Sequence, residues 1–279
     1  AIQQGSTLAG VGGYGPGTRA SALSAPLCNR PGHGLILATV SGPGVNSANN
    51  RALLRDDGSF VGLVRRTGQV VTELGGAVPS AFSEVLQNKS DDIIAIPYRL
   101  QASAATTPAV TKTNDSGLLL LNHAGALVTV VGTPPREGDA AYGGGGIFGQ
   151  FSGRAVCSVL QWAQFEAFFI PDTGRPVAAV WETRADGAVD KNLMVKAGDT
   201  AVGVVPATAT FSSFPGISQA NGFSLYRARL KGAPASANEG IWRSFVGLLV
   251  AKGADLTSAG LPGVRIGSIV RFWPVNSVG

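Results

Sequence analysis

The sequence has few charged residues and few cysteines. Charged side chains make up 14% of the 279 residues, against about 25% in an average soluble domain. The two cysteines, Cys28 and Cys157, are too few for a fold held together by disulfides and fit no metal-ligand spacing. They form either one disulfide or two buried thiols. We expect no metal and no other cofactor.

Long hydrophobic runs are also missing. No apolar run reaches the roughly 18 residues of a membrane-spanning helix, so we expect no membrane span. The chain begins with Ala1 rather than Met, as an exported protein does after its signal is removed, although a partial sequence begins the same way. We expect export, to the cell surface or the extracellular space.

Clusters of positive charge are absent although the net charge is +5. The longest basic run is Arg65–Arg66, and single-stranded nucleic acid is bound by basic grooves interleaved with aromatic side chains. The sequence therefore predicts a mildly basic surface and no nucleic-acid partner.

Recognisable catalytic motifs are missing too. His33 and His123 lie beside glycine in expected turns, no Ser or Cys occurs in a nucleophile elbow, and no glycine-rich run is followed by the Lys of a phosphate-binding loop. The acidic candidates fall mainly at turns, where Asp bonds the local backbone; they are Asp56, Asp57, Asp91, Asp92, Glu137, Asp139 and Asp199. We predict a non-enzymatic protein; a carbohydrate-active enzyme ranks third among our hypotheses and needs two converging carboxylates.

An internal repeat runs through the chain. A Leu, four residues and then Gly occur five times, with glycines at positions 13, 68, 132, 198 and 253. A second pattern alternates with the first; its members are Asn29–Ile36, Lys89–Ile96, Gln161–Phe168, Gln219–Tyr226 and the terminal Asn276–Gly279. The chain thus ends as a further repeat begins.

These residues resemble the bacterial NxxGxxAF tandem-repeat proteins, which often carry a "choice-of-anchor" label. Asn29–Ile36 and Gln161–Phe168 carry the pattern in degenerate form, and Gly198–Asp199 resembles the turn that recurs after a strand in that family. The resemblance covers nearly the whole chain. It implies export, surface display and a repetitive β architecture, and it supplies no catalytic residues.

One repeat reads as four short strands. In the fourth repeat these are 210–217, 223–230, 240–244 and 247–251, separated by Gly, Asn and Asp turns. Four-stranded sheets at such intervals are typical of propeller blades, although stacked solenoid sheets share the pattern. We predict one all-β, β-propeller-like domain over residues 1–279. Its complete repeats are 18–76, 79–138, 146–203 and 209–263, and terminal strands at 6–11 and 264–275 form a partial further blade.

The terminal strands need a pairing partner because a lone edge strand leaves backbone groups unpaired. Either they complete one blade within the chain, or one subunit pairs with the next to form a filament. The interface residues predicted on these strands are Leu8, Val11, Ile266, Ile269, Val270, Phe272, Trp273 and Val275.

Two functions follow from the alternatives. The leading hypothesis is a structural surface or fibre subunit that self-associates through its terminal strands. The alternative is a secreted binding module, closed within one chain, for a glycan or protein ligand. Exposed aromatic residues on one face would favour binding, whereas Trp162, Trp181, Trp242 and Trp273 lie in or beside expected strands, where such rings pack between sheets.

Overall fold

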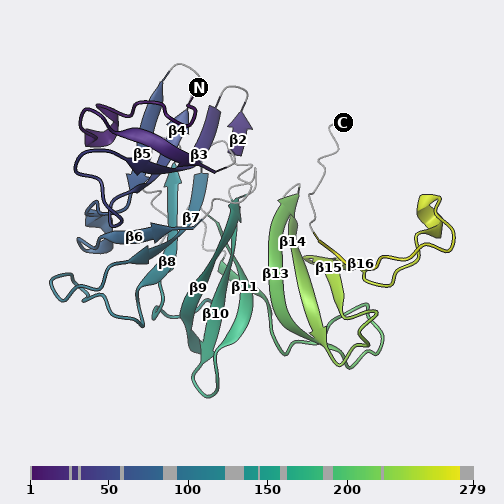
Figure 1. Cartoon of the computed structure of the whole chain (residues 1–279). Coiled ribbons are helices and arrows are strands. Elements are labelled where there is room, and N and C mark those ends of the chain that lie inside the picture. Colours follow the sequence, from purple (N-terminus) through teal and green to yellow (C-terminus); the bar gives the residue numbers. More distant parts are fainter. Residues whose placement is uncertain are drawn as a thin grey trace.

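The chain folds as a row of antiparallel β-sheets. The computed structural model describes residues 2–24, 27–30, 33–56, 60–83, 93–122, 135–143, 145–157, 162–184, 191–220 and 223–270. In these ranges it has four sheets and three short 3-10 helices, η1 (Val11–Gly13), η2 (Thr72–Leu74) and η3 (Thr257–Ala259). Figure 1 shows the sheets following one another from the purple N-terminal region to the yellow-green C-terminal region.

Each sheet is built from strands that are consecutive in the sequence. The first sheet contains β1 (Arg19–Leu23), β2 (Leu27–Arg30), β3 (His33–Ser41), β4 (Arg51–Asp56) and β5 (Val61–Arg66). The second contains β6 (Pro79–Phe82), β7 (Ile93–Leu100) and β8 (Ser116–Asn122). The third contains β9 (Gly146–Cys157), β10 (Trp162–Pro171), β11 (Val177–Arg184) and β12 (Lys191–Lys196). The fourth contains β13 (Thr210–Ala220), β14 (Phe223–Lys231), β15 (Glu239–Arg243) and β16 (Gly247–Ala251).

The prediction of an all-β chain with antiparallel sheets is confirmed, and each sheet lies within one predicted repeat. The first sheet is four strands wide, because β1 and β2 both pair with β3. The fourth strand expected in the second repeat, at Leu127–Gly132, lies outside the described residues. None of the helical segments in the described ranges has the length and hydropathy that a membrane crossing requires.

One turn geometry recurs before each of the four sheets and once more after the fourth sheet. A glycine with φ between +74° and +96° donates its N–H to the carbonyl of a residue in the next first-strand position. The pairs are Gly5 with Ala20, Gly68 with Pro79, Gly138 with Phe148, Gly198 with Phe211 and Gly253 with Ile266, at 2.7–3.0 Å. Glycine is favoured because a side chain is strained at positive φ.

This turn corrects two sequence predictions. The repeat glycines at 68, 198 and 253 are right, but the first position belongs to Gly5 rather than Gly13. At the third position Gly138 makes the bond, and Gly132 lies outside the described residues. The predicted strand 6–11 is wrong: Thr7 makes one bridge to Arg19, and the chain then turns into η1. Gly10, Gly12 and Gly13 all have positive φ there, which an extended strand does not accommodate.

The segment 266–270 occupies the position of a further first strand. In the last four of the five recurring turns, the residue three positions after the one whose carbonyl accepts the glycine N–H is apolar and buried. These residues are Phe82, Phe151, Phe214 and Ile269, and none is more than 7% exposed. The Arg227 guanidinium donates to the Val270 carbonyl at 3.1 Å, which ties the segment to β14. Arg265 makes one bridge to Asp255, but residues 264–270 form no strand. The rest of the predicted strand 264–275 lies outside the described residues.

The hydrophobic core lies between consecutive sheets. Leu37 of the first sheet packs with Ile96 of the second, Leu118 of the second with Phe165 of the third, and Val180 of the third with Phe211 of the fourth. The outer face of the first sheet is covered by Leu8 and Tyr14 of the N-terminal segment. Burial of these faces, at about 25 cal/mol per Å² of apolar surface, stabilises the row.

Candidate functional site

A pocket of about 720 Å³ opens at one end of the second sheet. Three segments build it: the turn that follows η2, the β7–β8 loop, and the recurring turn at Gly138. Its lining residues are Leu74, Gly75, Tyr98, Thr107, Pro108, Thr113, Asn114, Arg136, Glu137, Gly138 and Asp139. The volume is within the roughly 300–1,000 Å³ that is usual for ligand pockets.

Tyr98, Gly117 and Arg136 form a row across the second sheet. Tyr98 of β7 lies opposite Gly117 of β8, and Gly117 makes a bridge to Arg136 on its other side. The corresponding rows in the other sheets are Ala38–Ala52–Arg66, Ala167–Ala179–Lys196 and Ala228–Gly240–Ala251. Only this row pairs a tyrosine with the central glycine, so the phenol ring can lie over the glycine and line the pocket.

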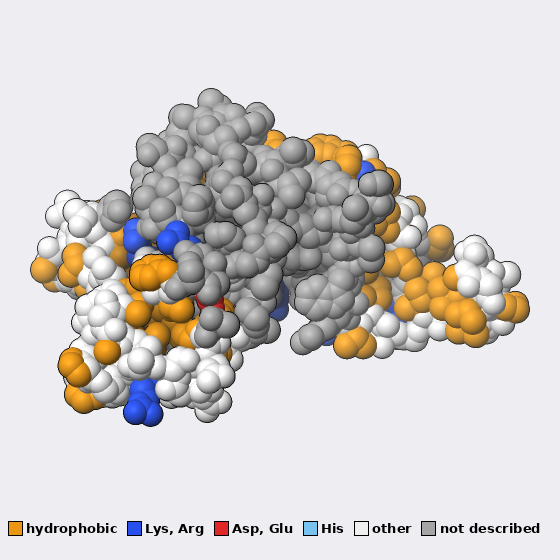
Figure 2. All heavy atoms as spheres, turned by 90° about the horizontal axis from the view of Figure 1, so that it is seen from above, with side chains coloured by type: hydrophobic (Ala, Val, Ile, Leu, Met, Phe, Trp, Pro, Cys, Tyr) orange, Lys and Arg blue, Asp and Glu red, His pale blue; other side chains and the backbone are white. Residues whose placement is uncertain are grey.

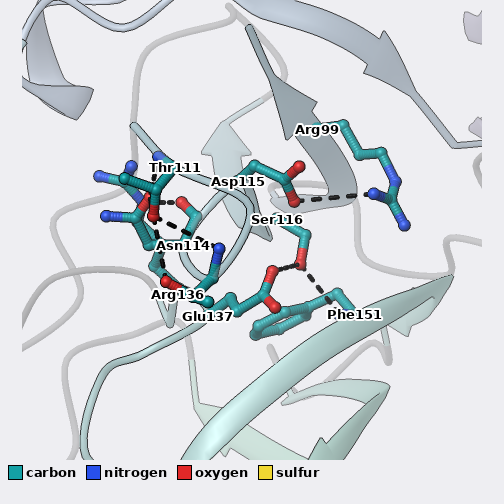
Figure 3. Close-up of polar contacts among 9 residues, drawn as sticks. Arg99, Thr111, Asn114, Asp115, Ser116, Arg136, Glu137 and Phe151 are labelled. Atoms are coloured by element: carbon teal, nitrogen blue, oxygen red, sulfur yellow. Dashed lines mark hydrogen bonds and ion pairs between the residues drawn. The ribbon is translucent and has the colours of Figure 1, made fainter. Parts of the chain in front are cut away.

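The Arg136 side chain is held rigidly at the pocket wall. Its Nε donates to the Asn114 carbonyl at 2.6 Å, and only 9% of the residue is exposed. Asn114 is fixed in turn, because its side chain accepts from the Thr111 N–H at 2.7 Å and donates to the Ala109 carbonyl at 2.9 Å. Figure 3 shows Arg136 beside Asn114, away from the Glu137 carboxylate. The guanidinium is therefore preorganised.

Two carboxylates, those of Glu137 and Asp139, follow Arg136 in the sequence and have different environments. Glu137 accepts from the Ser116 hydroxyl at 2.7 Å, and Ser116 accepts from the Phe151 N–H at 3.1 Å, as Figure 3 shows. Asp139 accepts the Arg136 N–H at 2.9 Å and so caps its own turn. Desolvation raises the pKa of both carboxyls, and the hydrogen bonds and Arg136 partly offset the rise at Asp139.

Two polar atoms at the pocket are buried without a partner, the Tyr98 hydroxyl oxygen and Nη2 of Arg136. Tyr98 is 2% exposed. Burial is the main cause that raises the pKa of Tyr98, while the charge of Arg136 lowers it, so the phenol stays protonated at neutral pH. A buried polar group without a hydrogen bond costs about 1–3 kcal/mol.

The residues predicted to form the subunit interface lie at both ends of the row of sheets. Leu8 and Ile269 are buried within their own chain, Val11 and Ile266 are half-buried, and Val270 is 76% exposed. Phe272, Trp273 and Val275 lie outside the described residues. An interface through the exposed positions stays a prediction.

For the cysteines, the structure has a free, buried thiol at Cys157, so the alternative of a disulfide with Cys28 does not hold there. Cys157 ends β9 and packs in the core between the second and third sheets. Burial raises the pKa of this thiol to about 12. The side chain of Cys28 is outside the described part of the structure.

The other predicted side chains fall into three groups. Glu137 and Asp139 meet at the pocket, whereas Asp199 caps the next turn through the Lys196 N–H at 2.9 Å. The core positions expected for Trp181 and Trp242 are confirmed, since both are at most 1% exposed. Asp57, Asp91, Asp92, His123 and Trp273 lie outside the described residues, as does the side chain of His33.

Sequence reasoning missed Tyr98 and Arg136. Tyr98 stands in an apolar strand segment and was indistinguishable from a core residue. An alignment of the four repeats by their turn glycines could have found it, because the equivalent residues are Ala38, Ala167 and Ala228.

Comparison with known protein families gives a match to part of the chain. Residues 2–140, just under half of the chain, match a family described as "Family of unknown function (DUF7453)". The matched part contains the N-terminal segment, the first two sheets and every residue that lines the pocket. No curated protein matches the chain.

Proposed function

We propose that this chain is a non-enzymatic binding module that holds a small polar ligand in the pocket of its second repeat. The observation that supports binding is the convergence of three loop segments on one pocket, with the Arg136 side chain held in its wall by the Asn114 carbonyl. A pocket with a few fixed polar groups is typical of a ligand site.

We also propose a propeller-like arrangement of the sheets and an extracellular or surface location. The propeller-like arrangement, in which each sheet is one blade, is supported by the face-to-face packing of consecutive sheets and by the turn that they share. The resemblance to exported NxxGxxAF repeat proteins and the low charge support the location.

Ligand-observed NMR tests the binding function. The wild type would be screened against monosaccharides, amino acids, dicarboxylates and phosphate. We expect at least one class to bind the wild type and to lose its signal with Arg136→Met. Lys196→Met is the matched control, because Lys196 has the same position in the third sheet. Equal binding by both variants, or no binding by the wild type, would contradict the proposal; circular dichroism checks that the variants fold.

A second candidate is the structural subunit that assembles through strand complementation. It is favoured by the segment 266–270, which occupies the position of a first strand without forming one, and by exposed apolar side chains in the C-terminal part of the chain. These include Leu249, Leu261, Val264 and Val270, each at least 45% exposed. Figure 2 shows hydrophobic side chains in orange on the projecting end of the molecule. Exposed apolar patches of this kind often mark interaction sites.

Deletion of residues 264–279 tests this second candidate. If the segment joins subunits, polymer seen by electron microscopy for the wild type disappears in the deletion variant, and light scattering falls to the monomer value. Polymer that survives the deletion, or a wild type that is monomeric at high concentration, argues against assembly.

A further inference from the structure

We infer that the pocket of the second repeat takes a neutral saccharide, held by adjacent hydroxyl groups between Arg136 and Asp139. This inference rests on the proposed binding function and adds the chemical class of the ligand. It follows from the charge balance of the lining, from its donors and acceptors, and from its apolar wall.

The charge balance disfavours an anion. Among the described residues that line the pocket, Arg136 is the one cationic residue, and Glu137 and Asp139 supply two acidic side chains. Sites for phosphate or carboxylate are usually built from Arg or Lys, whereas the described lining has one basic and two acidic side chains. An anionic ligand would gain one ion pair with Arg136 and be repelled by both acids.

A cation fits no better. Arg136 itself lies in the wall, and the Glu137 carboxylate already accepts the Ser116 hydroxyl. The described residues contain no cluster of three or more His, Cys, Asp or Glu side chains that could hold a metal ion. A neutral ligand with many hydroxyls avoids both penalties.

The hydrogen-bonding groups of the wall suit hydroxyls. Arg136 has donors beyond the Nε that binds Asn114, and one Asp139 oxygen caps the turn while the second is left to accept. A sugar hydroxyl both accepts and donates, so one hydroxyl can accept from the guanidinium while its neighbour donates to the carboxylate. Thr113 adds a further hydroxyl at the rim.

Part of the remaining wall is apolar. Leu74 and Pro108 line the same pocket and can pack against the C–H face of a sugar ring, as apolar residues do in pockets where a few polar groups fix orientation. Gly75 keeps the two loops in contact, since a Cβ there would lie 2.3 Å from the Thr107 carbonyl oxygen. The pocket thus has the mixed lining that a saccharide requires.

Isothermal titration with a panel of small ligands tests the inference. The neutral probes are methyl glycosides of glucose, galactose and mannose; the anionic probes are glucuronate, succinate and inorganic phosphate. We expect at least one methyl glycoside to bind, with an affinity that changes less than twofold between 20 and 500 mM NaCl, because screening acts only on charged partners.

Asp139→Asn is the informative variant, because an amide oxygen can still cap the turn while the charge is lost. We expect glycoside affinity to fall at least tenfold. Asp199→Asn is the matched control: Asp199 caps the equivalent turn of the third sheet and does not line the pocket. It should bind as the wild type does. Equal thermal unfolding of the two variants shows that both fold.

The outcomes separate the two proposals. Binding of an anionic probe that weakens with salt, without glycoside binding, overturns the saccharide inference and leaves the binding function standing. Glycoside binding that Asp139→Asn does not weaken also overturns the inference. If no probe of either class binds, the proposed binding function fails with it.

Discussion

The phenol of Tyr98 lies directly over Gly117 of the neighbouring strand. A Cβ on Gly117 would be 2.5 Å from the Tyr98 hydroxyl oxygen and 2.9 Å from the Pro135 carbonyl oxygen. The first and third sheets have an Ala–Ala pair at this position. The glycine therefore makes room for the tyrosine that lines the pocket.

Gly117→Ala is expected to lower the free energy of unfolding by about 1–3 kcal/mol, the usual cost of overpacking a core. Urea denaturation measures the change. In a Tyr98→Ala background the same substitution should cost less, because one of the two close contacts is gone, and a double-mutant cycle reports the difference. Equal costs in both backgrounds would show that the ring does not restrict position 117.

Glu182 makes stability depend on pH. It is 5% exposed, opposite Gln164 in the third sheet, and burial raises its pKa to about 7, a rise that Ser224 partly offsets. The unfolded carboxyl ionises near pH 4.3, so the folded state binds more protons between about pH 4.3 and 7. Stability should therefore be highest below this window, fall as the pH rises through it, and level off above pH 7.

Glu182→Gln isolates this contribution. The amide has nearly the same shape and does not titrate, so at pH 8 the variant should be more stable than the wild type by about 3–4 kcal/mol. At pH 4 the difference should vanish. Thermal unfolding between pH 4 and 8 gives both curves; parallel curves would rule out Glu182 as the source. Burial also raises the pKa of Glu137, Asp139 and Glu166. These groups are present in the wild type and in Glu182→Gln alike, so they do not contribute to the difference between the two curves.

The recurring turn predicts unequal costs for two glycine substitutions. Gly198 has φ +96° and no atom near the site of a Cβ, so Gly198→Ala should cost about 1 kcal/mol from backbone strain alone. Gly68 has φ +74°, and its Cβ would lie 2.8 Å from Asn49 Cβ and 3.1 Å from the Ala48 carbonyl. Gly68→Ala should cost about 1–2 kcal/mol more. Chemical denaturation of both variants measures the two costs. A cost for Gly198→Ala equal to or larger than that for Gly68→Ala would show that the close contacts at Gly68 do not matter.

Cys157 should resist thiol reagents in the folded protein. Its side chain is 1% exposed and its pKa is raised to about 12, so the reactive thiolate is scarce and shielded. The Cys28→Ser variant leaves Cys157 as the single thiol. We expect no labelling by a maleimide at pH 8 over an hour and complete labelling in denaturant. Rapid labelling without denaturant would show that the core between the second and third sheets opens readily.

Much of the fold could be predicted from local sequence. The strands expected at 210–217, 223–230, 240–244 and 247–251 agree with β13 to β16 to within three residues, because apolar alternation and Gly or Asn turns act over short distances. The turn register was harder. Gly13 satisfies the same Leu-x4-Gly pattern as Gly68, Gly198 and Gly253, and only the hydrogen bond of Gly5 shows that the first turn lies elsewhere.

The sequence by itself determined the β class, the repeated antiparallel sheets and the turn positions of Asp139 and Asp199, since these depend on composition and spacing along the chain. Only the tertiary structure decided which residues form a site. Tyr98 and Arg136 are 38 positions apart and become neighbours because β8 lies between them with a glycine at the crossing. Cross-strand pairing of this kind is set by the register of the whole sheet, which no local pattern contains.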